Sequence, residues 1–334
     1  MNSFAPVRLD WPGRRAPRPA PPAELELVHE GHPKSHVILG DNLAAMDALH
    51  KRGARCALVY FDPPFFTGRE HALVSRRRAQ DGTIERELLP GFDDRWNSLD
   101  EYLSTLLDRI ALARELLLPE GCLVLHVDPK TSHYLKVLCD EVFGARCFAS
   151  EIVWRYRRWP AKTRNFQRVH DVLLRYVRDA ASTPRFHQLY EPLAASTLAT
   201  WGDRRQRAVV DASGKRLRSS STREASPGTP LGDVWDIGIV APVARERTGY
   251  PTQKPEALIT RLLEALTEPG DLVLDPYLGS GTTLAVCARN GRHAIGIDQS
   301  RRAVQITRKR LAQSGLSPLH ERVVELDLPL ESVG

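Results

Sequence analysis

Short apolar runs alternate with amphipathic segments along most of the chain. Runs with the length and composition of buried strands lie at 36–39, 57–61, 122–127, 271–275 and 293–297. Segments that follow them repeat apolar residues at helical spacing. An alternation of strand and helix predicts parallel pairing with right-handed crossovers. We therefore expect an α/β fold with a mostly parallel, twisted sheet and helices on both faces.

The clearest predicted helix begins at Ser98, where Ser98-Leu99-Asp100-Glu101 has the pattern of a capping box. Its apolar face includes Tyr102, Leu106 and Ile110, and Pro119-Glu120-Gly121 ends it. A second helix is expected over 131–143. Further strands are expected at 151–156 and 172–177.

Three stretches lack this regular pattern, and they set the expected domain organisation. Residues 1–30 are rich in Pro and Arg and predict a disordered tail. Residues 179–233 are polar, basic and too long for an ordinary connection, which indicates an inserted recognition region. The two halves of the α/β domain are then 31–178, with a mobile loop at 67–95, and 234–315. A C-terminal tail is expected at 316–334.

Composition narrows the class of protein. The 334 residues carry a formal net charge of +6, a mild excess that suits a polyanionic partner. Five scattered cysteines form no Cys-x-x-Cys pair, which argues against a zinc site or a disulfide framework and favours a reducing, intracellular setting. No apolar run has the length of a membrane span. We expect neither a metal nor a membrane as a partner.

The tetrapeptide Asp62-Pro63-Pro64-Phe65 directly follows the buried run 57–61. Open α/β sheets place their chemistry at the carboxyl ends of strands, and two prolines make the turn rigid. The amino group of adenine or cytosine is a poor nucleophile because its lone pair is delocalised into the ring. A carboxylate and a Pro63 carbonyl that accept its two N–H groups would free that lone pair, while Phe65 stacks on the base. A Pro-Pro turn with a nearby Asp is also a common loop, so the rest of the chain must decide between the two.

Basic and aromatic residues are densest between the expected strands 151–156 and 172–177. Cations neutralise phosphates and aromatic rings stack on unpaired bases, so this mixture is typical of a nucleic-acid groove. A solvated basic face is the alternative. The candidate DNA-binding residues are Arg155, Arg157, Arg158, Trp159, Lys162, Arg164 and Arg168.

A second loop, 275–283, leads from a strand into a helix. Its glycines let the backbone approach a ligand, and Thr282 and Thr283 place free N–H groups at a helix N-terminus. Asp298, at the end of the next strand, has the offset at which nucleotide-binding folds hold ribose hydroxyls. The loop lacks the Gly-x-Gly-x-x-Gly pattern, which argues against NAD.

These motifs in this order resemble the amino-methylating DNA methyltransferases of the permuted β class. The resemblance covers roughly 36–178 and 234–313 and implies a Rossmann-like fold with the catalytic half first and the cofactor-binding half last. It implies S-adenosylmethionine as the cofactor and Asp62, Pro63, Pro64 and Phe65 as the catalytic residues. The cofactor-binding residues that it implies are Asp41, Thr252, Gln253, Lys254, Asp275, Pro276, Gly279, Gly281, Thr282, Thr283 and Asp298. Roles without a ligand stay open for three of them: a turn for Asp41, a helix start for Lys254 and a helix cap for Thr282.

Members of this family often have Tyr at the position of Phe65 and Glu at that of Asp298. An aromatic ring suffices for stacking, whereas the shorter Asp298 leaves the ribose contact open. We interpret His126 and His133 as structural rather than catalytic.

The first residue of the tetrapeptide bears on the target base. Relatives with Asp there mostly methylate N6 of adenine, which favours site-specific methylation of a flipped-out adenine in double-stranded DNA by a cytoplasmic, nucleoid-associated enzyme. N4-cytosine or RNA methylation is the alternative from the same chemistry, and a non-catalytic DNA-binding platform is the alternative from another class. A restriction endonuclease and a second copy of the chain are the further partners that the resemblance suggests.

Overall fold

A computed structural model describes residues 7–78, 84–160, 162, 164–207, 209–215, 217 and 220–326. The chain divides into two compact units, Met1–Arg185 with Val234–Gly334, and Phe186–Asp233. The strands of the first unit are β1 (Ala23–His29), β2 (His32–Leu39), β3 (Cys56–Phe61), β4 (Glu70–Arg78), β5 (Ile84–Asp93), β6 (Leu117–Val127), β7 (Phe148–Arg155), β8 (His170–Val177), β13 (Val234–Asp236), β14 (Leu272–Asp275), β15 (His293–Asp298) and β16 (Pro318–Glu325). Its helices are α1 (Asn42–Lys51), α2 (Leu99–Leu116), α3 (Ser132–Phe143), the short 3₁₀ helix Ala145–Cys147, α5 (Glu256–Leu266), α6 (Thr282–Arg289) and α7 (Arg301–Ala312).

A ten-stranded mixed sheet forms the centre of the first unit, in the order β1-β16-β2-β15-β14-β3-β6-β8-β7-β13. Its middle is parallel from β16 to β6, and β8 is antiparallel to both β6 and β7. The six residues of β3 are all buried, as expected of a strand covered on both faces. The α/β fold with a mostly parallel sheet is confirmed.

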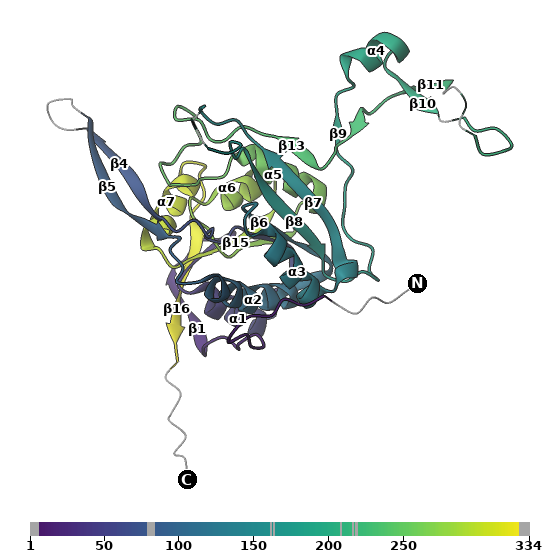
Figure 1. The fold of residues 1–334 in the computed structure, drawn as a ribbon. Coiled ribbons are helices and arrows are strands. Elements are labelled where there is room, and N and C mark those ends of the chain that lie inside the picture. Colours follow the sequence, from purple (N-terminus) through teal and green to yellow (C-terminus); the bar gives the residue numbers. More distant parts are fainter. Residues whose placement is uncertain are drawn as a thin grey trace. The chain divides into compact units, whose positions relative to one another are not determined.

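Helices cover the sheet in two groups, α1 with α2 and α3, and α5 with α6 and α7 (Figure 1). The predicted start of α2 is confirmed, because the Ser98 side chain accepts a hydrogen bond from the Glu101 N–H at 3.3 Å. Tyr102, Leu106 and Ile110 on its apolar face are fully buried. An amphipathic stripe of this kind fixes which face of the helix meets the sheet.

The N-terminal segment differs from the expected disordered tail. Residues Ala23–His29 form β1, which pairs antiparallel with β16, so part of the expected C-terminal tail is also a strand. Before it, the Arg15 guanidinium pairs with both carboxylate oxygens of Asp108 at 2.7 and 2.8 Å. Pairing between segments almost 300 residues apart leaves no local signal in the sequence, which is why the prediction was wrong here.

The expected mobile loop at 67–95 contains an antiparallel hairpin, in which β4 pairs with β5. Within the hairpin, 79–83 lie outside the described residues. The hairpin is not part of the large sheet, so neither of its faces has to be apolar along the whole strand. Its basic sequence therefore lacks the alternation of apolar and polar residues by which a strand is normally identified.

The second unit contains β9 (Tyr190–Glu191), α4 (Ala195–Trp201), β10 (Arg204–Arg207), β11 (Ser220–Ala225) and β12 (Thr229–Pro230). Its strands form two small antiparallel pairs, β10 with β11 and β9 with β12. None of the described α4 residues is buried. The unit begins slightly later than the insertion expected at 179–233. Among the described residues of the whole chain, no helix combines the length and apolar character that crossing a bilayer requires.

Candidate active site

Four of the predicted acidic site residues lie at one edge of the sheet. Asp41 follows β2, Asp62 follows β3, and Asp275 and Asp298 end β14 and β15. These strands are neighbours in the order β2-β15-β14-β3 and all run in the same direction. Parallel pairing therefore gathers at one edge side chains that lie far apart in the sequence, where open α/β sheets bind their ligands.

Asp62 forms an ion pair with Lys254, the residue that precedes the N-cap of α5. The Lys254 ammonium donates to the two carboxylate oxygens of Asp62 at 2.7 and 2.6 Å. It also lies 5.1 Å from the centre of the Phe65 ring, within the range of a cation–π contact. The two side chains are mostly buried, with 12% of Lys254 and 16% of Asp62 exposed. The structure thus places Lys254 on the carboxylate, whereas its contact with the methionyl part of a cofactor stays a prediction.

His126, on β6, lies beside the same carboxylate. Its ring is fully buried, with Nδ1 2.8 Å from the Tyr60 hydroxyl and 3.7 Å from Asp62 Oδ1. Its Nε2 lies 3.4 Å from Asp171 Oδ2, and its ring centre is 5.7 Å from that of Phe65. The sequence interpretation treated His126 as structural. A histidine within an otherwise apolar strand was the available signal, but only the pairing of β3 with β6 brings it next to Asp62.

The protonation of this cluster follows from its neighbours. Burial, followed by the charge of Asp62, raises the pKa of Tyr60 well above its ordinary value, so its hydroxyl keeps its proton. Burial of Asp171 opposes its ionisation, but the interactions with His126 and then Lys254 outweigh it and lower the pKa of Asp171. An ionised carboxylate only accepts, so the Asp171 oxygen that lies 3.4 Å from His126 Nε2 can act only as an acceptor.

The glycine loop is fixed to Asp298. The Gly279 N–H donates to Asp298 Oδ2 at 2.9 Å, and the Ser300 N–H donates to Oδ1 at 2.8 Å. Gly281, the N-cap of α6, has a φ of 72°. A Cβ at Gly281 would lie 2.5 Å from the Thr307 side chain, so the position has neither the backbone angle nor the space for another residue.

Two carboxyl groups at this edge resist ionisation. Burial raises the pKa of Asp275 to about 7, although a hydrogen bond from Thr283 works in the opposite direction. Burial raises the pKa of Asp298 to about 6, against the hydrogen bonds from the backbone N–H groups of Ser300 and Gly279. Shifts of this kind gather at functional sites. Pro276 follows Asp275, and its carbonyl accepts from the Asn42 side chain at 2.9 Å.

Three other predicted cofactor residues make contacts within the protein. Asp41 caps α1 by accepting from Leu43 and Ala44, and it pairs with Arg109 at 2.8 Å. Thr282 donates to the Lys254 carbonyl at 3.2 Å. The Gln253 side chain accepts from Thr248 and donates to the Glu246 carbonyl, which closes the loop before α5. Thr252 in that loop has a φ of 56°, a left-handed angle that β-branched residues rarely adopt.

The basic segment connects β7 and β8 at the same edge of the sheet as Asp62. Arg155 pairs with Asp236 at 2.6 Å and Arg168 with Asp128 at 3.3 Å, so both of these arginines are partly neutralised within the protein. Arg158 lies over the Tyr156 ring at 5.1 Å.

The other candidates in this segment face solvent. Arg157, Lys162 and Arg164 are exposed. Trp159 is 89% exposed and Phe166, which was not among the candidates, is 98% exposed. Large exposed rings among cations suit stacking on bases.

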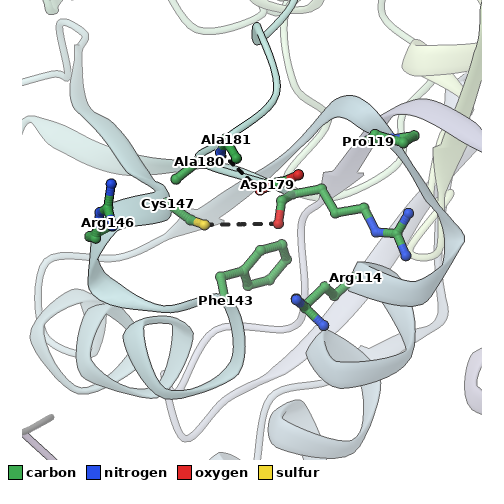
Figure 2. Close-up of a pocket in the computed structure, with 9 residues that line it drawn as sticks. Arg114, Pro119, Phe143, Arg146, Cys147, Asp179, Ala180 and Ala181 are labelled. Carbon is green, nitrogen blue, oxygen red and sulfur yellow. Dashed lines mark hydrogen bonds between the residues drawn. The ribbon is translucent and has the colours of Figure 1, made fainter.

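A hollow of about 490 Å³ lies at the opposite edge of the sheet, near the start of β6 and the end of β8 (Figure 2). Its described lining comprises Arg114, Pro119, Phe143, Arg146, Cys147, Arg178, Asp179, Ala180 and Ala181. The lining contains none of the predicted site residues. The predicted acidic site residues lie instead at the carboxyl edge of the sheet.

The chain matches a known protein family over most of its length. The pattern of the N6_N4_Mtase family, described as DNA methylase, matches residues 56–309. The chain belongs to this N6/N4 family of DNA methyltransferases, and its substrate is DNA.

Individual relatives span most of the chain. It is 27% identical over 287 residues to the DNA adenine methyltransferase YhdJ of Escherichia coli, covering 86% of this chain and 85% of that protein. It is 27% identical over 270 residues to the type II methyltransferase M.HpaI of Haemophilus parainfluenzae, covering 80% and 72%.

Solved structures agree in fold. The M1.HpyAVI–SAM complex matches with a TM-score of 0.51 at 19% identity, covering 83% of this chain and 98% of that one. The PvuII DNA methyltransferase, which is cytosine-N4-specific, matches with a TM-score of 0.51 at 17% identity, covering 85% and 90%. At such identities, the agreement concerns the fold.

Proposed function

We propose that this DNA methyltransferase transfers the methyl group of S-adenosylmethionine to N6 of an adenine flipped out of double-stranded DNA. The observation that carries the proposal is the carboxylate of Asp62, held at the end of β3 beside the Phe65 ring and among three other acidic strand ends. The similarity to the adenine methyltransferase YhdJ supports the choice of base.

The donor set fits S-adenosylmethionine. Asp41, Asp275 and Asp298 end or follow neighbouring strands, and Asp298 also binds the glycine loop, so these side chains can accept hydrogen bonds from a ligand with amino and hydroxyl groups. Asp298 uses one lone pair of each oxygen on a backbone N–H, and the remaining lone pairs can accept ribose hydroxyls. When bound, the cofactor supplies an electrophilic methyl group.

Further cofactor contacts are assigned by resemblance. We assign the methionyl side of the cofactor to Thr252, Gln253, Lys254, Asp275, Gly279, Gly281, Thr282 and Thr283, and we place Pro276 among the cofactor-binding residues. We assign Asp41 to the adenine ring of the cofactor.

The catalytic loop prepares the target amino group. Asp62 accepts one N–H of the amino group and the Pro63 carbonyl accepts the other, which turns the nitrogen lone pair away from the ring. Phe65 stacks on the base, and Pro64 keeps the turn rigid. Because the Lys254 ammonium contacts both Asp62 oxygens, the N–H of the incoming base competes with it for the carboxylate. The proton lost from nitrogen after transfer passes to Asp62 or to water.

DNA binding is assigned to the segment between β7 and β8. Arg155, Arg157, Arg158, Lys162, Arg164 and Arg168 would contact phosphates, and Trp159 would stack on a base. The small unit 186–233 would carry target recognition. The relative M.HpaI is a type II methyltransferase, which supports a restriction endonuclease as a functional partner. A homodimer is a further proposal from the family resemblance.

The direct test is to incubate the purified protein with S-adenosylmethionine and unmethylated genomic DNA and to identify the methylated nucleoside by mass spectrometry. N6-methyladenine is expected. N4-methylcytosine would overturn the choice of base. Asp62→Asn should abolish methyl transfer and leave cofactor binding intact, because the amide keeps the size of the side chain but has no negative charge to hold the amino N–H and cannot take up its proton. An Asp62→Asn variant that still methylates would remove Asp62 from the mechanism.

A further inference from the structure

A chain of polar side chains leads from the catalytic loop to the basic segment between β7 and β8. Asp62 lies next to His126 Nδ1, and Asp171, the second residue of β8, lies next to His126 Nε2 on the other side of the ring. The Tyr156 hydroxyl donates to Asp171 Oδ1 at 2.9 Å, and Arg158 donates to that hydroxyl at 3.2 Å. The four steps join three strands of the sheet and the start of the basic segment.

His126 is held on every side. Tyr60 and Asp62 come from β3 and the loop that follows it, and Asp171 comes from β8. The rings of Phe65 and Trp154 lie 5.7 and 5.4 Å from its ring centre. A buried imidazole that contacts two carboxylates and the base-stacking ring can hardly move without moving the loop.

We infer that His126 is a positioning residue. Its contact with Asp171 holds the imidazole in place, and the imidazole in turn sets the orientation of Asp62 and Phe65 toward the target base. This inference rests on the proposed role of Asp62, but not on which base is methylated. In the proposed mechanism the base contacts Asp62 and Phe65, and His126 contacts those two residues rather than the base. The same contacts connect Arg158 to the catalytic loop, because Arg158 donates to the Tyr156 hydroxyl, which donates to Asp171.

Two amide variants separate the two sides of the ring. His126→Asn retains a polar group near Nδ1, toward Tyr60, and loses the arm toward Asp171. His126→Gln retains a polar group near Nε2, toward Asp171, and loses the contact with Tyr60. His133→Asn is the matched control, because His133 is a histidine on the exposed face of α3. Asp171→Asn tests the contact between His126 and Asp171 from its other end.

The assay counts tritiated methyl groups transferred to DNA, so methylation of either base is recorded. We expect His126→Asn, which loses the arm toward Asp171, and Asp171→Asn to lower kcat by about 100-fold, as small displacements of a catalytic group do. His126→Gln, which keeps that arm, should lower kcat much less. The KM for S-adenosylmethionine and its dissociation constant without DNA should stay close to those of the wild type, whereas the Tm of the His126 variants should fall because a buried ring is replaced by a smaller amide. His133→Asn should match the wild type in every measurement.

Two results would overturn the inference. Unchanged kcat in His126→Asn, or an equal loss of kcat in His126→Gln, would show that Asp62 is not oriented through the contact with Asp171. A loss of kcat accompanied by a comparable fold-loss of cofactor affinity would show that His126 only maintains the fold. Methylated cytosine in the wild-type product would overturn the choice of adenine and would leave this comparison of variants valid.

Discussion

Replacing Lys254 with methionine removes the cation that holds both oxygens of Asp62. At the 2.7 Å that separates Nζ from Oδ1, two unit charges attract by about 6 kcal/mol at an effective dielectric constant of about 20. Desolvation of both groups offsets most of this attraction, because only 12% and 16% of the two side chains are exposed. We expect a net coupling free energy of about 2 kcal/mol between the two side chains, between the values for exposed and for buried pairs.

A double-mutant cycle measures this coupling. The free energy of unfolding in urea is determined for the wild type, Lys254→Met, Asp62→Asn and the double variant, without cofactor. Lys51 and Asp47 on α1 form the control pair, since their N–O distance is also 2.6 Å but 61% of the Lys51 side chain is exposed. The control cycle, with Lys51→Met and Asp47→Asn, should give about 0.4 kcal/mol.

Additive effects of the two site changes, within about 0.5 kcal/mol, would refute the argument. The ion pair would then contribute no net stability, and release of Asp62 to a base would cost nothing. A coupling near the expected value would mean that binding of the base and cofactor must replace the contact that Lys254 makes.

Three further predictions concern the glycine loop, the buried acids and the basic segment. Gly281→Ala should lower stability by about 1–3 kcal/mol and weaken cofactor binding, because its Cβ would lie 2.5 Å from the Thr307 side chain at a φ of 72°. Gly238→Ala is the control, since a Cβ there would meet no atom within 4 Å and the φ is not positive. It should be nearly neutral in urea unfolding and in cofactor titration. Burial raises the pKa of Asp275 to about 7, so the folded protein keeps a proton on this carboxyl group that the unfolded chain releases from about pH 4 upward. The free energy of unfolding of the wild type therefore falls as the pH rises from about 4 to about 7. Asp275→Asn should therefore gain stability relative to the wild type between about pH 4 and 7 in urea unfolding, and a constant difference would contradict the assignment. Trp159→Ala should weaken DNA binding by about 1–3 kcal/mol in fluorescence anisotropy with little change in salt dependence, whereas an unchanged affinity would exclude stacking by this ring.

Local pattern was sufficient for the elements that position the site. The apolar run before Asp62 predicted a buried strand, and β3 is buried throughout. The Ser98 capping box predicted the start of α2, and its side chain makes the expected contact. Both signals involve residues within a few positions of each other, so the sequence carries them directly.

Long-range pairing accounts for the features that were missed. The strand β1 has its partner at the other end of the chain. His126 lies 66 residues from Tyr60 in the sequence yet bonds to it. In each case the neighbour that gives the residue its role is absent from the local sequence.

The sequence by itself determined where the strands end, that an acidic residue stands at each of four ends, and that Asp62 begins a rigid turn, because periodicity and proline chemistry act over a few residues. Only the tertiary structure decided which groups face that carboxylate. The order of strands brings His126 beside it, and the entry to α5 brings Lys254 onto it across 192 residues. The physical reason is that side-chain neighbours across a parallel sheet are set by strand order and register, which depend on burial over the whole domain rather than on adjacent residues.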